Sequence, residues 1–494
     1  MDSSESSSLR RSIGFVLGIV LFTAVWAGPV PEGLSPAAAK TGAIGLLMAA
    51  WWITEAIPIA ATALVPLVLF PLLGVSDMSA AASPYANPLI FLFMGGFMIA
   101  QAMQTWNLHR RIALGIVRWV GVRPASIVIG FILASAFLSM WVSNTATALM
   151  MLPIGLSIID LTADRLEADI TSAAPHFGLV LVLSIAYACN VGGIATLIGT
   201  PPNALLAGFM SESYGVEVGF AEWMMIGLPV ALCLLPFVYL ALTWIYPIEL
   251  ETLPGGADLI DQEIAELGDV SRAERRVGIV FVLTALLWIT RPLLTDFIPA
   301  LSDAGIAMGA ALVLFVIPSG TENRALLSWP DAEDLPWGVL ILFGGGLSLA
   351  AQISDTGLAE WVGGGVSALS GWPVLGLLLA TVALIVVLTE ITSNTATTAA
   401  FLPILGAVAI GVGENPFLLA VPAALGASCA FMLPVATPPN AIIYGSGLLS
   451  IPQMSRVGAW LNLLSIVLVS CLAYVLLGLA FGVEIGTLPP WAGG

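Results

Sequence analysis

Apolar stretches about as long as a membrane is thick alternate with short polar segments along almost the whole chain. A helix needs about 20 apolar residues to cross the hydrocarbon core of a bilayer, which is about 30 Å thick. The pattern therefore predicts an all-α polytopic membrane protein with about 11 transmembrane helices. We expect these spans at residues 13–30, 42–57, 59–73, 88–105, 174–210, 223–246, 277–296, 301–318, 336–353, 416–448 and 457–483.

Two further apolar stretches are each divided by the same cluster of small polar residues. The sequence Ser-Asn-Thr-Ala-Thr occurs at 143–147 and again at 393–397. Each half of the surrounding stretch has about 15 residues, or roughly 22 Å of helix, which is too short to cross the core. We therefore predict a re-entrant helical hairpin at 124–160 and a second at 373–411, each with the polar cluster at its tip.

A second polar interruption follows each hairpin, inside a longer apolar run. It reads Gly-Thr-Pro-Pro-Asn at 199–203 and Ala-Thr-Pro-Pro-Asn at 436–440. Two consecutive prolines remove two backbone donors and cannot lie inside a continuous helix. Unwound backbone at membrane depth is tolerated where protein or a water-filled cavity surrounds it. The spans 174–210 and 416–448 are therefore predicted to be broken helices.

The second half of the chain repeats the first. Trp-Ile-Thr-Glu at 52–55 corresponds to Trp-Ile-Thr-Arg at 288–291, and Pro153 after the first polar cluster corresponds to Pro403 after the second. Each repeat is expected to hold five crossings and a hairpin, and an odd number of crossings turns the second copy upside down. The sequence thus predicts two inverted repeats.

Three segments outside the spans have a different character. Residues 1–12 begin with a polar, serine-rich stretch and are expected to be disordered. Residues 107–121 combine arginines and His109 with apolar positions, which predicts an amphipathic helix at the membrane surface. Residues 249–276 contain seven acidic residues and no basic one through Asp269. We expect a solvated linker between the two halves there, and a regulatory or metal-binding segment is the alternative.

Composition agrees with this class, because 59% of the residues are hydrophobic, 9% are charged, and the mean hydropathy is +1.02. These values exclude a soluble enzyme. The sequence contains no nucleotide-binding loop and no catalytic triad, so we expect neither an enzyme nor a partner of nucleic acid. The 31 acidic residues outnumber the 14 basic ones. Such an acidic surface suits a high-salt environment, where charge repulsion is screened, although an ordinary acidic membrane protein is the alternative.

Basic residues are distributed unevenly over the predicted loops, and cytoplasmic loops of membrane proteins carry an excess of Lys and Arg. A topology with the N-terminus in the cytoplasm and the C-terminus outside the plasma membrane places only Lys40 and Arg291 outside. The cytoplasmic side then receives twelve arginines: Arg10, Arg11, Arg110, Arg111, Arg118, Arg123, Arg165, Arg272, Arg275, Arg276, Arg324 and Arg456.

The four polar interruptions are the candidate functional segments. Ser, Asn and Thr cap backbone N–H groups at a helix start, so the second arm of each hairpin directs the positive end of its dipole at the middle of the membrane. Two such ends can hold an anion. The unwound segments free carbonyl oxygens, which together with hydroxyl and amide oxygens suit a hard cation such as sodium.

Neither motif contains Lys, Arg or His, so a bound anion has to be balanced by helix ends and co-bound cations. The alternative is that these side chains only form hydrogen bonds between helices. Two copies at hairpin tips, each paired with its own proline break, favour a binding site.

These motifs, together with the run Trp-Trp-Ile-Thr-Glu-Ala-Ile-Pro at 51–58, resemble the divalent anion:sodium symporter family, which transports dicarboxylates, citrate or sulfate with sodium. The resemblance covers nearly the whole chain. It implies a homodimer in the lipid bilayer, in which a transport domain moves against a scaffold as an elevator. The corresponding parts are the scaffold (13–105 and 277–353), the transport domain with its linking helices (106–248 and 354–483), the linker (249–276) and the C-terminal tail (484–494).

The resemblance also implies roles for individual residues. One sodium ion is expected among Ser139, Ser143, Asn144 and the carbonyl of Gly199, and another among Thr389, Asn394 and the carbonyls of Thr392 and Ala436. A small dicarboxylate is expected to meet Ser143, Asn144, Thr145, Ser393, Asn394, Thr395, Thr200, Pro201, Thr437 and Pro438.

Sodium-coupled import of C4-dicarboxylates such as succinate, malate and fumarate is the leading functional hypothesis. A sodium-independent dicarboxylate or citrate exchanger and a transporter of sulfate or another inorganic anion are the alternatives. Glu390, just before the second cluster, is expected either to tune cation affinity or to serve packing or face water. Glu55 and Arg291 are interpreted as scaffold anchors outside the site, and His109 and His176 as interfacial residues.

Overall fold

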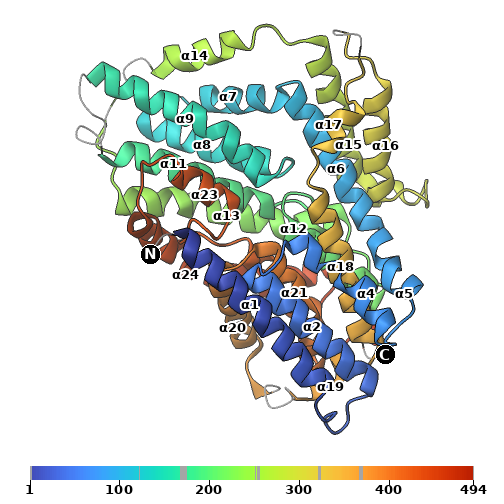
Figure 1. Ribbon diagram of the computed structural model, residues 1–494. Coiled ribbons are helices and arrows are strands. Elements are labelled where there is room, and N and C mark those ends of the chain that lie inside the picture. The colour runs from blue at the N-terminus through green and yellow to red at the C-terminus, as the bar shows by residue number, and fades with distance from the viewer. Residues whose placement is uncertain are drawn as a thin grey trace.

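The computed structural model describes residues 3–121, 123–166, 175–250, 252, 256–320, 324–365 and 371–492. Within these residues the chain is helical, apart from one isolated β-bridge between Pro318 and Ala325 (Figure 1). By length and composition, nine of the described helices can cross a membrane, and shorter apolar helices accompany them. The predicted class, an all-α polytopic membrane protein, is therefore confirmed.

The N-terminal part begins with a helix, so the prediction of disorder for residues 1–12 is wrong from Ser3 onward. The helix that contains the apolar run from Ile13 continues back to Ser3. Arg10 Nη2 donates to the carbonyl of Ile53, at 3.0 Å, and so holds this N-terminal part of the helix. Residues 1 and 2 lie outside the described part. The helices up to the first hairpin are α1 (Ser3–Trp26), α2 (Pro36–Thr54), α3 (Ile59–Thr62), α4 (Val65–Leu72), α5 (Met78–Ala82), η1 (Ser83–Ala86), α6 (Pro88–Thr105) and α7 (Leu108–Val120).

Helix α1 packs mainly on α2, and few of its residues are buried. The glycines of α1 allow the two helices to approach each other closely, because a Cβ at Gly18 would lie 2.6 Å from the indole of Trp51. The Trp51 indole nitrogen in turn donates to the carbonyl of Phe15, at 3.3 Å. The two helices thus form a pair at the edge of the molecule.

Each half of the chain contains a helical hairpin followed by a broken helix, as the sequence predicts. The tips are residues 140–143 and 390–393, and the Asn of each cluster is the first residue of the second arm. The inversion of one half relative to the other remains a prediction. The elements are α8 (Pro124–Ser139), α9 (Asn144–Leu166), α11 (Pro175–Ile194) and α12 (Pro201–Tyr214) in the first half, and α20 (Val374–Thr389), α21 (Asn394–Gly411), α22 (Phe417–Ala427) and α23 (Pro438–Tyr444) in the second.

The unwound segments of the broken helices differ from the predicted interruptions. They comprise residues 195–200 and 428–437, and the Pro-Pro-Asn of each motif opens the following helix, α12 or α23. Proline is favourable in the first turn of a helix, where its missing N–H would have no partner in any case. The prediction that the prolines themselves are unwound is therefore wrong.

The acidic linker is more structured than predicted, because it contains helix α14 (Gly256–Glu266), which packs on α7. Arg110 pairs with Glu263, and Arg118 Nε lies 3.1 Å from Asp261 Oδ1. The linker is thus held against the interfacial helix, although Glu251 and residues 253–255 lie outside the described part. The remaining helices are α13 (Phe220–Ile245), α15 (Arg272–Leu294), α16 (Asp303–Val316), α17 (Trp329–Glu333), α18 (Trp337–Asp355), α19 (Leu358–Gly365), α24 (Ile451–Phe481) and η3 (Pro490–Ala492).

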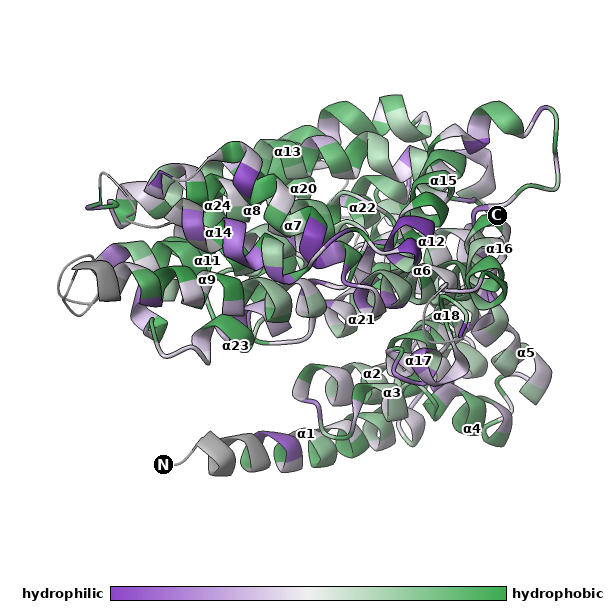
Figure 2. Cartoon of the chain, turned by 90° about the horizontal axis from the view of Figure 1, so that it is seen from above, coloured by the Kyte–Doolittle hydropathy of each residue, from purple (hydrophilic) through white to green (hydrophobic). Residues whose placement is uncertain are grey.

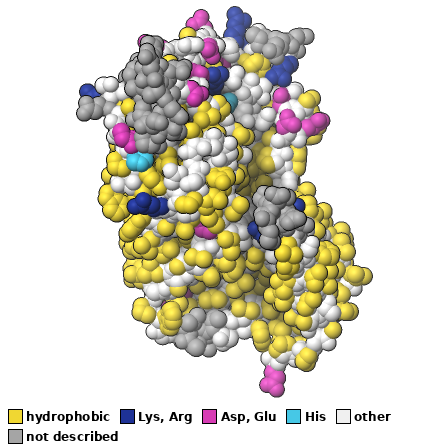
Figure 3. All heavy atoms as spheres, turned by 60° about the vertical axis from the view of Figure 1, so that its left-hand side comes forward, with side chains coloured by type: hydrophobic (Ala, Val, Ile, Leu, Met, Phe, Trp, Pro, Cys, Tyr) yellow, Lys and Arg dark blue, Asp and Glu magenta, His cyan; other side chains and the backbone are white. Residues whose placement is uncertain are grey.

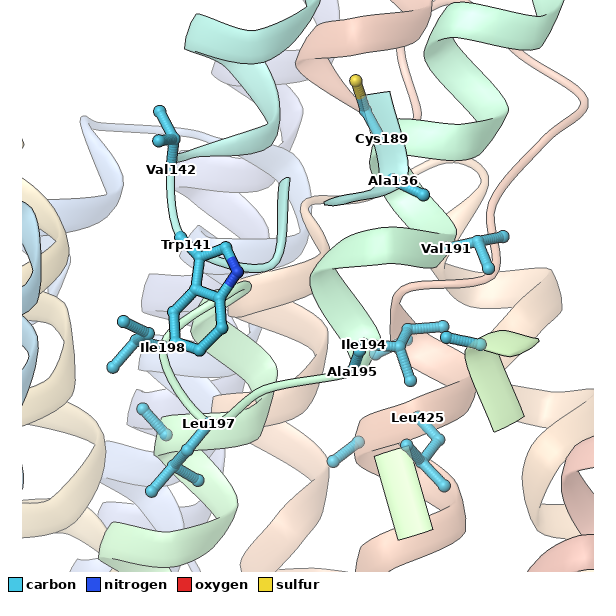
Figure 4. Packing of buried hydrophobic residues seen from close by; sticks show 14 of the residues in the cluster. Ala136, Trp141, Val142, Cys189, Val191, Ile194, Ala195, Leu197, Ile198 and Leu425 are labelled. Carbon is cyan, nitrogen blue, oxygen red and sulfur yellow. The ribbon is translucent and has the colours of Figure 1, made fainter. Parts of the chain in front are cut away.

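Helix α11 is the centre of the core. Its apolar window, His176–Ile194, is completely buried, and it packs against α8, α9, α13 and α23. Figure 4 shows Trp141, from the tip of the first hairpin, beside Ile198 of the first unwound segment. The tip of the first hairpin therefore packs on the first unwound segment.

The remaining helices lie around this core. Seen from above, α1 to α4 and α17 lie on one side, and α8, α11, α13, α20 and α24 lie on the other (Figure 2). Hydrophobic side chains cover the middle and lower part of the face in Figure 3, and charged side chains gather toward its upper end. This distribution is that of a protein whose solvent is lipid over most of its height.

The crossing of α6 and α16 depends on a glycine. A Cβ at Gly95 would lie 2.7 Å from the backbone carbonyl carbon of Ala307. We expect Gly95→Val to push the helices apart and to destabilise the protein by about 1–3 kcal/mol. Thermal unfolding of the purified protein in detergent measures this effect. Gly309→Val on exposed α16 surface, where a Cβ meets nothing within 4 Å, is the control, and equal melting temperatures for both variants would contradict the prediction.

Candidate functional site

A cavity of about 720 Å³ lies where the hairpin tips and the unwound segments meet. Its wall includes every residue that the sequence analysis expects to contact substrate. These residues are Ser143, Asn144, Thr145, Thr200, Pro201, Ser393, Asn394, Thr395, Thr437 and Pro438. Gly199 and Ala436, two of the expected cation ligands, also line it.

The opposite wall comes from the turn between α2 and α3, from α6 and from the turn before α18. The charged residues on the described cavity wall are Glu55 and Asp334, and both are acidic. The interpretation of Glu55 as a residue outside the site is therefore wrong, because the end of α2 reaches the cavity. Arg291 agrees with its expected anchoring role, since its Nε lies 2.8 Å from Asp303 Oδ1, away from the cavity.

In the first hairpin, a buried serine holds the asparagine of the polar cluster in place. Ser139 donates its hydroxyl to Asn144 Oδ1, and its Oγ lies 2.8 Å from the carbonyl oxygen of Cys189 on α11. Ser143 Oγ accepts the backbone N–H of Ala146, at 3.2 Å, and so caps α9. The expected cation ligands Ser139 and Asn144 are thus in direct contact.

The second hairpin repeats this arrangement with a threonine. Thr389 donates to Asn394 Oδ1 and lies 2.9 Å from the carbonyl of Ala427, at the end of α22. Thr392 is further from the cavity, and its hydroxyl contacts Thr397. Each hairpin therefore carries one hydroxyl that links its asparagine to the end of a broken helix.

Gly193 is a part of the site that the sequence analysis missed. A Cβ at this position would lie 2.7 Å from Asn144 Oδ1 and 3.1 Å from the carbonyl oxygen of Gly199. Two of the expected cation ligands therefore lie close to Gly193, on the side where a Cβ would project. Any side chain at this position would occupy the space between them. The double glycine at the end of α11 is the sequence signal that could have shown this.

The last asparagine of each proline motif holds the unwound backbone together. Asn203 Nδ2 donates to the carbonyls of Gly193, at 3.0 Å, and Thr196, at 2.7 Å. Asn440 Nδ2 donates to the carbonyls of Ala430 and Leu433, both at 3.1 Å. These bonds satisfy carbonyls that have lost their helical partners. They leave other carbonyls, such as that of Gly199, for a ligand.

Glu390 caps the second unwound segment. Its side chain accepts the backbone N–H groups of Phe431, Met432 and Leu433 at 2.7, 2.9 and 3.0 Å, and the amide of Asn462 at 2.7 Å. The residue is buried, so the expectation that it faces water is wrong. The first hairpin has Met140 at the corresponding place, because α11 continues to Ile194 and leaves fewer unpaired N–H groups.

The helix N-termini of α9 and α21 begin at the cavity and direct their positive ends toward it, and the first residues of α12 and α23, Pro201 and Pro438, also line it. Thr145, Thr200, Ser393 and Thr395 form no side-chain hydrogen bond within the described part of the chain, so their hydroxyl groups are available to a ligand. The site thus offers hydroxyl and N–H donors, and no basic side chain lines it within the described part of the chain. Such a site can hold an anion only with cations beside it.

The chain is similar to known proteins over nearly its whole length. The sequence profile described as the sodium:sulfate symporter transmembrane region matches residues 9–482. A protein of Staphylococcus saprophyticus named sodium-dependent dicarboxylate transporter SdcS is 44% identical over 489 residues, which is 98% of this chain and 94% of that protein. A protein of the same name from Staphylococcus aureus is 45% identical and covers 97% of this chain and 93% of its own length.

Two solved structures share the overall fold. MtrF of Neisseria gonorrhoeae, described as an antimetabolite efflux pump, has a TM-score of 0.58 at 13% identity and covers 94% of both chains. The YdaH transporter of Alcanivorax borkumensis has a TM-score of 0.60 at 17% identity and covers 89% of this chain and 99% of its own. At these identities the likeness concerns the fold alone.

Replacement of Gly193 tests the first cation position. We expect Gly193→Ala to place a methyl group between Asn144 Oδ1 and the Gly199 carbonyl and to weaken sodium binding by about tenfold or more, or about 1.4 kcal/mol. The sodium concentration that gives half-maximal thermal stabilisation measures this change. Gly115→Ala on α7, where a Cβ meets nothing within 4 Å, is the control. An unchanged sodium requirement in Gly193→Ala would place the cation elsewhere.

Replacement of Glu390 tests the cap of the second unwound segment. In Glu390→Gln, an amide nitrogen replaces one of the two carboxylate oxygens that accept hydrogen bonds, and the negative charge of the side chain is lost. We therefore expect the free energy of unfolding to fall by about 2 kcal/mol. Chemical or thermal unfolding in detergent measures it. Glu333→Gln, at an exposed position without a described side-chain partner, is the control. If both variants unfold like the unaltered protein, the carboxylate does not hold this segment.

Proposed function

This chain belongs to the sodium:sulfate symporter family, and we propose that it is a sodium-coupled importer of C4-dicarboxylates such as succinate, malate and fumarate. The observation that carries the proposal is the convergence of both polar clusters and both unwound segments on one cavity, whose wall has no basic side chain among the described residues. The names of relatives at 44% and 45% identity, sodium-dependent dicarboxylate transporters, support the choice of substrate and of cation.

The anion is bound by neutral donors. A C4-dicarboxylate carries one carboxylate at each end, and the cavity has one helix N-terminus with its polar cluster from each half of the chain. Each carboxylate would accept bonds from one cluster, with Thr200 and Thr437 beside them on the wall. Charge-assisted hydrogen bonds of this kind contribute about 1.5–3 kcal/mol each.

Sodium supplies the positive charge that the site lacks. The first ion would take the Asn144 amide oxygen, the hydroxyls of Ser139 and Ser143 and the carbonyl of Gly199. The second would take Asn394, Thr389 and the carbonyls of Thr392 and Ala436. These are neutral oxygens of the kind that hard cations prefer. Because cations and anion share the two asparagines, binding of one favours binding of the other.

Transport requires the site to face both sides of the membrane in turn. The cavity wall includes Glu55 and Asp334, which the predicted topology places near the cytoplasmic side, and this supports an inward-facing state. We infer that the hairpins and broken helices then move together against the scaffold as an elevator, in a homodimer with its N-termini in the cytoplasm. The close packing of the hairpin tip on the broken helix supports movement as one body (Figure 4).

The free energy that sodium coupling supplies to the uptake of the dianion can be estimated. Each tenfold sodium gradient supplies about 1.4 kcal/mol per ion, and one net charge gains about 2.3 kcal/mol per 100 mV. Three ions and one net positive charge per dianion would thus supply about 6.5 kcal/mol, enough for a concentration ratio on the order of 10⁴ to 10⁵.

Uptake of labelled succinate into proteoliposomes tests the function. We expect uptake to require an inward sodium gradient, to proceed without internal succinate, and to be faster with a negative potential inside, because the site cannot hold a dianion without cations. Full uptake without sodium that depends on an internal dicarboxylate would establish an exchanger instead. Sodium-dependent uptake of labelled sulfate, with no uptake of succinate, would establish an inorganic anion transporter.

A further inference from the structure

We propose that the end of α13 and the start of α24 form a binding surface for an anionic phospholipid, in which Arg456 binds the phosphate and Trp244 and Trp460 lie beside the glycerol. The two helices pack on each other, and the Tyr246 hydroxyl donates to the carbonyl of Gln453 in the first turn of α24, at 3.3 Å. The predicted topology places this surface on the cytoplasmic side. It lies outside the cavity and is independent of the proposed transport activity.

Two exposed tryptophans, one from each helix, mark the surface. Trp244 is 71% exposed and Trp460 is 53% exposed, and their rings meet edge to face with centroids 5.8 Å apart. Neither indole N–H has a hydrogen-bond partner within the described part of the chain, so both can donate to ester or phosphate oxygens. Such side chains are favourable at the headgroup level of a bilayer, where one end of the ring is wet and the rest is apolar.

Arg456 lies one turn before Trp460 on the same face of α24. It is exposed and has no hydrogen bond or ion pair among the described residues. Helix α24 contains no acidic residue, and the acidic residue of α13, Glu222, lies at the opposite end of that helix. Glu249, which follows α13, pairs with His176 at 2.6 Å. Arg456 therefore carries a positive charge that is available to a phosphate group, which a guanidinium binds through two parallel N–H groups.

An apolar face continues from the tryptophans along both helices. Phe237 and Leu240 on α13 and Leu463 and Val467 on α24 are exposed, and their spacing of three or four residues keeps each pair on one face of its helix. The face extends from Arg456 to Val467 over roughly 16 Å at 1.5 Å per residue. This length is about half of a hydrocarbon core that is about 30 Å thick. It matches the acyl chains of a lipid in one leaflet.

The charge of the surface selects the kind of lipid. A zwitterionic headgroup carries its own cation, whereas the negative charge of phosphatidylglycerol remains for Arg456. An arginine near an anionic membrane surface accounts for a preference of about fivefold. A soluble phosphate compound has no acyl chains for the apolar face, so it gains only the contact with the guanidinium. The surface therefore fits an anionic phospholipid better than either alternative.

Competition between two lipids tests the inference. The purified full-length protein is mixed in detergent with equal amounts of phosphatidylglycerol and phosphatidylcholine, and native mass spectrometry identifies the lipid that is retained most tightly. We expect the unaltered protein to prefer phosphatidylglycerol about fivefold, Arg456→Gln to retain both lipids equally, and Arg456→Glu to prefer phosphatidylcholine. Arg275→Gln is the control and should keep the preference. Arg275 is also exposed and has no described hydrogen bond or ion pair, but the exposed residue one turn later is Ile279 rather than tryptophan.

Two results would overturn the role of Arg456. If Arg456→Gln keeps the preference, the arginine does not bind the headgroup. If Arg275→Gln loses the preference to the same extent, lipid is attracted by the basic side of the protein as a whole and not by this surface.

A second variant and a soluble competitor test the part played by the acyl chains. We expect Trp460→Leu to retain several-fold less of both lipids at an unchanged ratio, because it removes contact area and an N–H donor but no charge. Glycerol 1-phosphate, which has the phosphate without the chains, should not displace phosphatidylglycerol. Unchanged retention in Trp460→Leu, or displacement by glycerol 1-phosphate, would contradict a lipid site, and displacement would indicate a site for soluble phosphate compounds instead.

Discussion

Backbone groups that leave a helix inside a membrane protein must find partners within the protein, because lipid provides none. The whole site follows from this constraint. Asn203 and Asn440 bind carbonyls of the unwound segments, Glu390 binds N–H groups, and Ser139 and Thr389 link the hairpins to the ends of the broken helices. Only the groups that these side chains leave unpaired are available to ions and substrate.

The two halves of the chain meet the same requirement in different ways. In the first half, α11 continues to Ile194 and the unwound segment is short, so a neutral Met140 can occupy the hairpin tip. In the second half, α22 ends at Ala427 and the longer unwound segment needs the carboxylate of Glu390. The two expected cation positions are therefore not electrically equivalent, because only the second has an acidic residue in the adjoining hairpin tip.

Much of this architecture could be predicted from the sequence, since membrane thickness and proline chemistry set the lengths and interruptions of the helices. The hairpins and the broken helices followed from two short motifs, and the ten cavity residues followed from the family resemblance that these motifs carry. What the sequence could not show depends on neighbours distant in the chain. Three features arise only when segments distant in the sequence meet: the contact of Gly193 with Asn144, the partners of Glu390, and the position of Glu55 on the cavity wall. The helix within the acidic linker likewise depends on the arginines of α7.

The pairing of α1 with α2 has a consequence for biosynthesis. Helix α1 leaves the ribosome just before α2, and its close contacts, such as Gly18 against Trp51 and Arg10 with Ile53, are with α2. This pair can therefore assemble at the translocon before the later helices of the chain are made. The central helix α11, by contrast, is enclosed by segments that are synthesised both before and after it. Its environment is complete only after α23 has entered the bilayer, so the proposed ion and substrate site is among the last parts of the molecule to form.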